Sequence, residues 1–285
     1  MRRAGRHFLQ IPGPSNVPER ILRAMAEPTI DHRSPRFAGL TRELLSDLKK
    51  VFQTSDPVLL FPSSGTGAWE AALVNTLSAG DRVLAFETGH FATLWRKIAE
   101  KLGLEVDWVP GDWRRGADLE TLRAKLEEDD AHTLKAILVV HSETSTGALS
   151  DIAGIRRIMD SANHPALLLV DTISSLGSVD YRHGEWGVDV TVCCSQKGLM
   201  LPPGLGINAI SQKALNAGTT ANLARSYWDW GPVISMNERG FFPYTPPTNL
   251  LFGLSEALRM MLEEGLENIF SRHRRLAEAT RSAVS

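Results

Sequence analysis

Residues 166–171 read Ala-Leu-Leu-Leu-Val-Asp, five apolar residues followed directly by an acid. An apolar run without alternation is typical of a strand that is buried on both faces, as in a parallel sheet. A carboxylate at the end of such a strand is costly unless it is paired or hydrogen-bonded. This stretch therefore predicts both a parallel sheet and a polar site at one edge of it.

Similar apolar runs recur along the chain and alternate with amphipathic stretches, which is the pattern of a parallel sheet covered by helices. The expected strands are Val58–Pro62, Arg82–Phe86, Glu105–Val109, Lys135–Val140, Ala166–Val170, Val188–Cys194 and Gly206–Ile210. The expected helices between them are Thr66–Leu77, Thr93–Leu102, Leu119–Glu127 and Ile152–Ser161. The predicted fold class is α/β, with a mostly parallel seven-stranded sheet and helices on both faces.

The two ends of the chain depart from this alternation. Prolines in residues 1–20 predict an extended segment before a short helix from Glu19. The aromatic and proline-rich stretch Arg239–Pro247 is expected to be irregular, followed by helices at Thr248–Glu264 and Asn268–Val284. We expect residues 249–285 to be the helical start of a C-terminal region that is truncated here.

Composition excludes several classes of function. The formal net charge of -2 gives no electrostatic reason to expect nucleic acid or an acidic membrane as a partner. No apolar run approaches the roughly 20 residues that span a bilayer, and the basic N-terminus lacks the apolar core of a signal peptide. The adjacent Cys193 and Cys194 predict buried reduced thiols, so we expect a cytoplasmic protein. The eight histidines show no metal-ligand spacing, so no metal site is expected.

In open α/β sheets, ligands bind at the carboxyl ends of the strands. The first expected strand ends at Ser63-Ser64-Gly65-Thr66-Gly67, where small residues and free N–H groups at a helix start favour a phosphate. An ordinary helix cap with a tight turn would use the same residues. From this segment alone both interpretations stay open.

Two further strand ends carry groups with distinct chemistry. Asp171 could hold a cationic ring nitrogen, or could be a turn acid that bonds Thr172 and Ser174. Lys197 could form a Schiff base if burial lowers its pKa, or could be a surface lysine in a loop. Because the two residues end successive strands, they should meet at one sheet edge. A phosphate cup, a pyridinium partner and an imine lysine together suit one cofactor, pyridoxal phosphate (PLP).

The chain resembles the class V aminotransferases, and among them the serine/alanine–glyoxylate aminotransferases, which have the fold-type I architecture of PLP transferases. The matching segments, in the family's order, are Pro12–Ser15, Ser64–Gly67, Ser142–Gly147, Val170-Asp171, Ser195–Gly198 and Pro202–Gly204. The resemblance implies that residues 21–248 form the PLP-binding large domain.

The resemblance also implies roles for individual residues. Lys197 would form the Schiff base and move the substrate proton, and Asp171 would keep the pyridine nitrogen protonated. The residues expected to bind the phosphate are Ser64, Gly65, Thr66 and Gln196. Those expected beside the ring are Phe91, where many relatives carry tryptophan, and Thr144.

In the family a tyrosine and a threonine of the partner subunit also reach the phosphate. Tyr244 and Thr248 are the candidates, although the spacing around Tyr244 is one residue longer than in some relatives. Alternatively, the aromatic residues of this segment only pack an interface. Either interpretation predicts a homodimer. The substrate-binding arginine of relatives lies in a C-terminal domain to which no residue here can be matched.

The function hypothesis is an aminotransferase that moves an amino group from serine or alanine, with aspartate a further option, to glyoxylate by a ping-pong mechanism. A desulfurase of the same fold is disfavoured because Cys193 and Cys194 lie inside an expected strand rather than in a mobile loop. The remaining alternative is a PLP-binding but catalytically impaired homologue that acts as a subunit or interaction protein.

Overall fold

A computed structural model describes residues 8–284. Its strands are β1 (Val58–Ser63), β2 (Arg82–Phe86), β3 (Glu105–Val109), β4 (Leu134–Val140), β5 (Leu167–Asp171), β6 (Val190–Cys194) and β7 (Gly204–Ile210). They form one sheet in the order β1-β7-β6-β5-β4-β2-β3. β7 runs antiparallel to both of its neighbours, and the other pairs are parallel. The α/β class and the mostly parallel seven-stranded sheet are confirmed.

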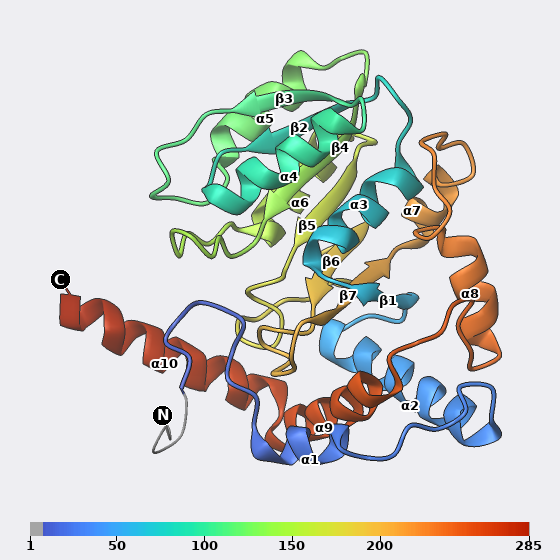
Figure 1. Cartoon of the computed structure of the whole chain (residues 1–285). Helices are drawn as coiled ribbons and strands as arrows, with labels where there is room; N and C mark the ends of the chain where they lie inside the picture. The colour runs from blue at the N-terminus through green and yellow to red at the C-terminus, as the bar shows by residue number, and fades with distance from the viewer. Residues whose placement is uncertain (1–7, 285) are drawn as a thin grey trace.

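The helices cover both faces of this sheet (Figure 1). One face carries α3 (Gly65–Thr76), α4 (His90–Lys101), α7 (Gln212–Ala217) and α8 (Trp230–Glu238). The other carries α1 (Glu19–Met25), α2 (Pro35–Phe52), α5 (Leu119–Glu128), α6 (Ile152–Ser161), α9 (Thr248–Glu264) and the start of α10 (Leu266–Val284). In Figure 1 the rest of α10 extends away from the body of the molecule.

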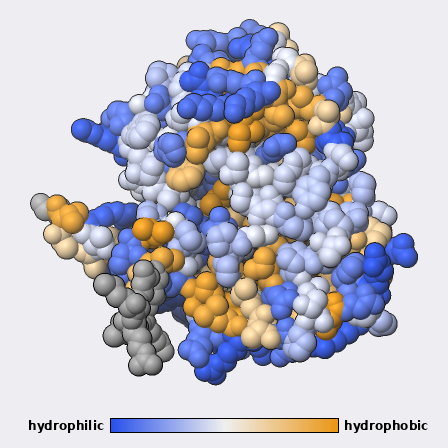
Figure 2. All heavy atoms as spheres, in the orientation of Figure 1, coloured by the Kyte–Doolittle hydropathy of each residue, from blue (hydrophilic) through white to orange (hydrophobic). Residues whose placement is uncertain are grey.

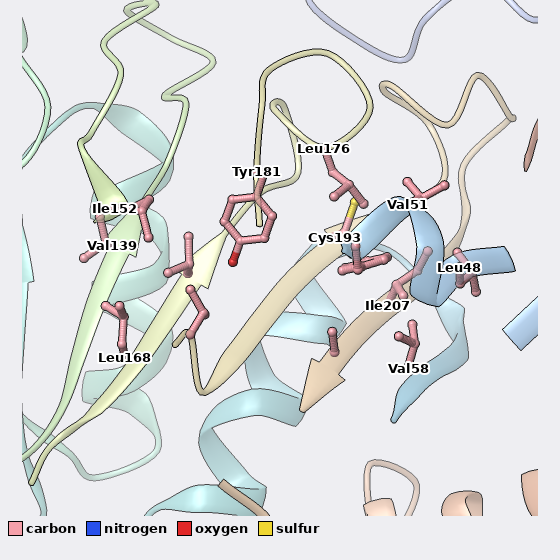
Figure 3. Packing of buried hydrophobic residues seen from close by; sticks show 14 of the residues in the cluster. Leu48, Val51, Val58, Val139, Ile152, Leu168, Leu176, Tyr181, Cys193 and Ile207 are labelled. Carbon is pink, nitrogen blue, oxygen red and sulfur yellow. The ribbon is translucent and has the colours of Figure 1, made fainter. Parts of the chain in front are cut away.

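Two apolar cores hold these layers together, because alternate residues of each strand point to opposite faces. Figure 3 shows part of the core under α2, where Leu48 and Val51 lie over Val58 of β1 and Ile207 of β7. The opposite core is centred on α3 and includes Trp69, which is 2% exposed. A sheet buried on both faces leaves only its edges for a polar site.

The expected strands all form, with ends displaced by at most two residues. Asp171 is the last residue of β5 rather than the first residue after it. The helix expected from Thr93 begins at His90, because a side chain from another segment caps it, as described below. The helix expected from Asn268 begins at Leu266, directly after Gly265 ends α9.

Residues 8–18 contain no helix or strand, as expected, and residues 1–7 of that predicted segment lie outside the described residues. Residues 239–247 are irregular, also as expected. Within the described chain, no helix is both long and apolar enough to pass through a membrane. On the face shown in Figure 2, apolar residues reach the surface in patches between hydrophilic ones.

Candidate active site

The carboxyl ends of β1, β4, β5 and β6 lie at one edge of the sheet. β1 points the same way as β6 because β7, which lies between them, is antiparallel to both. A cavity of about 210 Å³ opens there. The residues that line it are Gly13, Pro14, Ser64, Gly65, Thr66, Trp69, Phe91, Thr144, Ile173, Gln196, Lys197 and Pro203. It therefore brings together seven of the residues predicted to bind the cofactor.

The start of α3 forms a cup for an anion at one side of this cavity. Ser64 is the N-cap residue, but within the described chain its side chain makes no capping hydrogen bond to the helix. The first N–H groups of a helix need acceptors and favour a negative charge. Gln196 also lines the cavity, and the N–H groups of its side-chain amide are donors that an anion could use. A helix start with free N–H groups beside an amide donor fits a phosphate group.

Lys197 follows β6 and lies under the N-terminal segment. Its Nζ donates a hydrogen bond to the carbonyl oxygen of Pro12 at 3.1 Å. Ser15 fixes the segment in place, with its N–H 2.9 Å from the Gln196 carbonyl oxygen and its hydroxyl 3.1 Å from that of Lys197. Partial burial lowers the pKa of Lys197. A larger share of neutral amine at neutral pH is what a nucleophilic lysine requires.

Asp171 is 3% exposed and lies behind the cavity wall rather than on it. Trp69 Nε1 donates to its Oδ2 at 2.9 Å, and the Ile173 N–H donates to its Oδ1 at 2.6 Å. Burial nevertheless raises the pKa of Asp171 to about 7. Because Trp69 and Ile173 both line the cavity, the carboxylate sits one side chain away from any ligand in it.

The walls of the cavity come from two other segments. Phe91 projects from the first turn of α4, with its ring 6.5 Å from that of Trp69. Trp69 in turn stacks on Trp95 with ring centroids 5.9 Å apart. Thr144 follows β4 and shares a hydrogen bond with the hydroxyl of Ser174. A cavity lined by aromatic and polar side chains together suits an aromatic ring that carries a phosphate.

Tyr244 and Thr248 do not line this cavity in their own chain. The Tyr244 hydroxyl donates to the Leu60 carbonyl oxygen, and its ring packs near Phe61 and Tyr227. Thr248 is buried at the start of α9. Their expected role toward the partner subunit stays a prediction.

A second cavity, of about 520 Å³, adjoins the first, and Lys197 and Thr144 line both. Arg272 of α10 lines the second cavity, and so does His273. Arg272 makes a bidentate pair with Glu264, at 2.7 and 2.9 Å, so the carboxylate already offsets its charge. This is the space next to Lys197 that a small substrate could enter.

The two cysteines are free and buried in β6, as expected. Burial raises the pKa of Cys193, and that of Cys194 to about 12, so neither is a ready nucleophile. Within residues 8–284, no three His, Cys, Asp or Glu side chains gather in a way that could hold a metal ion.

Comparison with known proteins places this chain in a family. The family model for class-V aminotransferases matches residues 7–285, and the chain belongs to that family. It is an aminotransferase whose cofactor is pyridoxal phosphate. The open helix start, with no side-chain cap on its N–H groups, and the half-buried Lys197 amine fit that cofactor.

Among its relatives, the chain is 50% identical over 290 residues to the serine–glyoxylate aminotransferase of Methylorubrum extorquens, covering 100% of this chain and 72% of that protein. It is 47% identical to the L-aspartate–glyoxylate aminotransferase of Paracoccus denitrificans, covering 96% of this chain and 69% of that protein. The crystal structure of an alanine–glyoxylate aminotransferase from Nostoc sp. superposes with a TM-score of 0.89 at 34% identity, covering 98% of this chain and 74% of that one.

Some residues of the cavity were not identified from the sequence. Trp69 lies one helical turn after Gly65 on α3, so its position on the cavity side could have been inferred from helical spacing. Ile173 lies two residues beyond the end of β5, and only the path of the loop brings it to the cavity. No local pattern marks Pro203 as a cavity residue.

Proposed function

We propose that this chain transfers the amino group of serine or alanine, with aspartate as a further donor, to glyoxylate and so produces glycine. The observation that carries the proposal is the cavity in which the Lys197 amine meets the open start of α3. The names of the serine–glyoxylate and L-aspartate–glyoxylate relatives support glyoxylate as the acceptor.

Ser64, Gly65, Thr66 and Gln196 are proposed to hold the phosphate of PLP. When it is bound, PLP supplies an electron sink for the bond that breaks at the substrate Cα. The chain itself would supply the base. The Lys197 amine would take the proton from the substrate Cα and deliver it to the cofactor carbon that is bonded to the transferred nitrogen. Burial favours its neutral form, which is the form that can accept a proton.

Asp171 is proposed to hold a proton at the pyridine nitrogen. A buried carboxylate with a pKa raised to about 7 gains more from a cationic partner than a solvated one would. Phe91 and Thr144 are proposed to fix the plane of the ring, which decides how the reacting bond is oriented. Trp69 and the Ile173 N–H each donate one hydrogen bond to this carboxylate, and a carboxylate has lone pairs to accept a further donor.

The second cavity is proposed to receive the amino acid and glyoxylate in turn. Its volume of about 520 Å³ exceeds what such small molecules fill, and it meets the cofactor cavity at Lys197. One space can serve both substrates in a ping-pong mechanism, because the two bind at different times.

A homodimer with shared sites is also proposed. The outer side of residues 239–247 helps to line a hollow of about 580 Å³, together with His32 and Arg33. Thr245 is exposed there. A phosphate held in a partner's cavity would meet positive charge on this surface, and Tyr244 and Thr248 are the side chains proposed to reach it. A cytoplasmic location is proposed as well, supported by two free cysteines.

The test is an isotope transfer with the purified chain, PLP, ¹⁵N-labelled L-serine and glyoxylate. The proposal predicts ¹⁵N-glycine from the wild type and none from Lys197→Ala. Parallel reactions with labelled alanine and aspartate identify the preferred donor. A protein that binds PLP but transfers no label from any of the three would support the impaired homologue instead.

A further inference from the structure

The side chain of Glu143 is completely buried between the end of β4 and α4; the residue lines the second cavity but not the adjoining cofactor cavity. A buried carboxylate is costly unless several donors surround it. Glu143 accepts from the N–H groups of Phe91 at 3.3 Å and Ala92 at 3.1 Å. It also accepts from the N–H and hydroxyl of Ser145, at 3.0 and 2.8 Å.

Glu143 thereby caps a helix to which it does not belong. Helices are usually capped by a Ser, Thr, Asp or Asn directly before the first turn. The residue there in α4 is Gly89, which has no side chain to offer. A Cβ at position 89 would lie 2.7 Å from Glu143 Cδ and 2.6 Å from Ser145 Oγ. The glycine therefore leaves room for the Glu143 carboxylate, which we call the distant cap of α4.

The distant cap joins two parts of the cavity wall that are more than 50 residues apart in the chain. Phe91 lies on the α4 side of this connection, and Thr144 lies between the two bonding residues on the other side. Ser145 strengthens it, because its hydroxyl accepts the His90 N–H at 2.9 Å. A local cap at position 89 would satisfy α4 but would leave Phe91 free to move relative to Thr144.

We infer that Glu143 is a positioning residue that sets the positions of Phe91 and Thr144 relative to each other in the wall of the cofactor cavity. The inference rests on the proposed cofactor site and adds a determinant of its geometry. The negative charge of Glu143 acts on the same site, since it contributes to the raised pKa of Asp171.

The test compares Glu143→Gln with a matched control, Asp129→Asn. Asp129 is also a buried carboxylate that accepts backbone N–H groups, from Thr133 and Leu134, but it lies at the opposite end of β4. Both variants should lower the melting temperature. Only Glu143→Gln should raise the Kd for PLP, by about tenfold or more if a charged hydrogen bond is lost. Only it should change the circular dichroism of the bound cofactor.

A second readout needs no cofactor. The amide protons of Phe91 and Ala92 should exchange faster in Glu143→Gln than in the wild type or in Asp129→Asn. If Glu143→Gln does not fold, Ser145→Ala removes two bonds of the same connection and should change the PLP affinity and circular dichroism in the same direction. A folded variant with wild-type Kd and circular dichroism would overturn the inference. Failure of the wild type to bind PLP would overturn the cofactor site itself and this inference with it.

Discussion

Gly13 occupies the space beside the Lys197 side chain. A methyl group at this position would lie 2.5 to 2.6 Å from Lys197 Cε, Cδ and Nζ, which is closer than real contacts allow. Because the end of a lysine side chain is flexible, the fold can absorb the change by moving the amine. The substitution therefore displaces the reactive group rather than the backbone.

Gly13→Ala should lower the share of protein that binds PLP covalently, while the free energy of unfolding changes by less than about 1 kcal/mol. Borohydride reduction followed by mass spectrometry measures that share. Gly39→Ala is the control, since a methyl group there meets nothing within 4 Å. Equal covalent labelling of both variants and the wild type would show that the crowding at Gly13 has no consequence.

Asp171 makes the free energy of unfolding of the cofactor-free protein depend on pH. Its pKa in the folded chain is about 7, above the usual aspartate value near 4, so the folded state holds the proton more tightly than the unfolded state. The stability from this group is therefore complete below about pH 4 and is lost as the pH rises through 7. Asp171→Asn should remove that part of the slope.

Urea unfolding at pH 5 and pH 8 measures this effect. The loss of stability between the two pH values should be smaller in Asp171→Asn than in the wild type. An identical loss in both proteins would mean that Asp171 is ionised at little cost, and its raised pKa would be wrong.

At the scale of elements, α2 shows what the sequence analysis left out. Its 18 residues bury Phe37, Leu44 and Leu48 against the sheet. That spacing is helical, and the start is marked by Ser34 as N-cap and a proline at the first position. These local signals are sufficient to predict α2 from the sequence, although it was not among the predicted helices.

Ser34→Ala tests the start of α2. The Ser34 hydroxyl accepts the Phe37 N–H at 3.2 Å, and loss of such a cap costs about 1 kcal/mol. Ser161→Ala serves as the control, because its hydroxyl only donates to the Arg157 carbonyl oxygen at the exposed end of α6. In chemical unfolding, Ser34→Ala should have a lower midpoint concentration of denaturant than Ser161→Ala. Equal midpoints for the two variants would contradict the capping role of Ser34.

The start of α4 could not have been predicted from the sequence. The local residues favour a start near Thr93, and the first turn forms because Glu143, more than 50 residues away, accepts its N–H groups. Strand positions were predictable, because buried apolar runs are a local signal. The approach of Trp69 to Asp171 was not, since it depends on how α3 packs on the sheet.

At the scale of the whole molecule, the proposed shared site makes a prediction about assembly. Light scattering should give twice the 31.3 kDa of one chain. The Kd for PLP should rise when the protein is diluted below the dissociation constant of the dimer, because the partner's contacts to the phosphate are then lost. A monomer that binds PLP with the same affinity at every protein concentration would contradict a shared site.

The most direct test of the whole account is to reduce the protein with borohydride in the presence of PLP and to map the modified residue by peptide mass spectrometry. We expect the cofactor to be attached to Lys197 and Lys197→Ala to carry none at that position. Attachment to another lysine, such as Lys213, or no attachment in a folded protein, would contradict it.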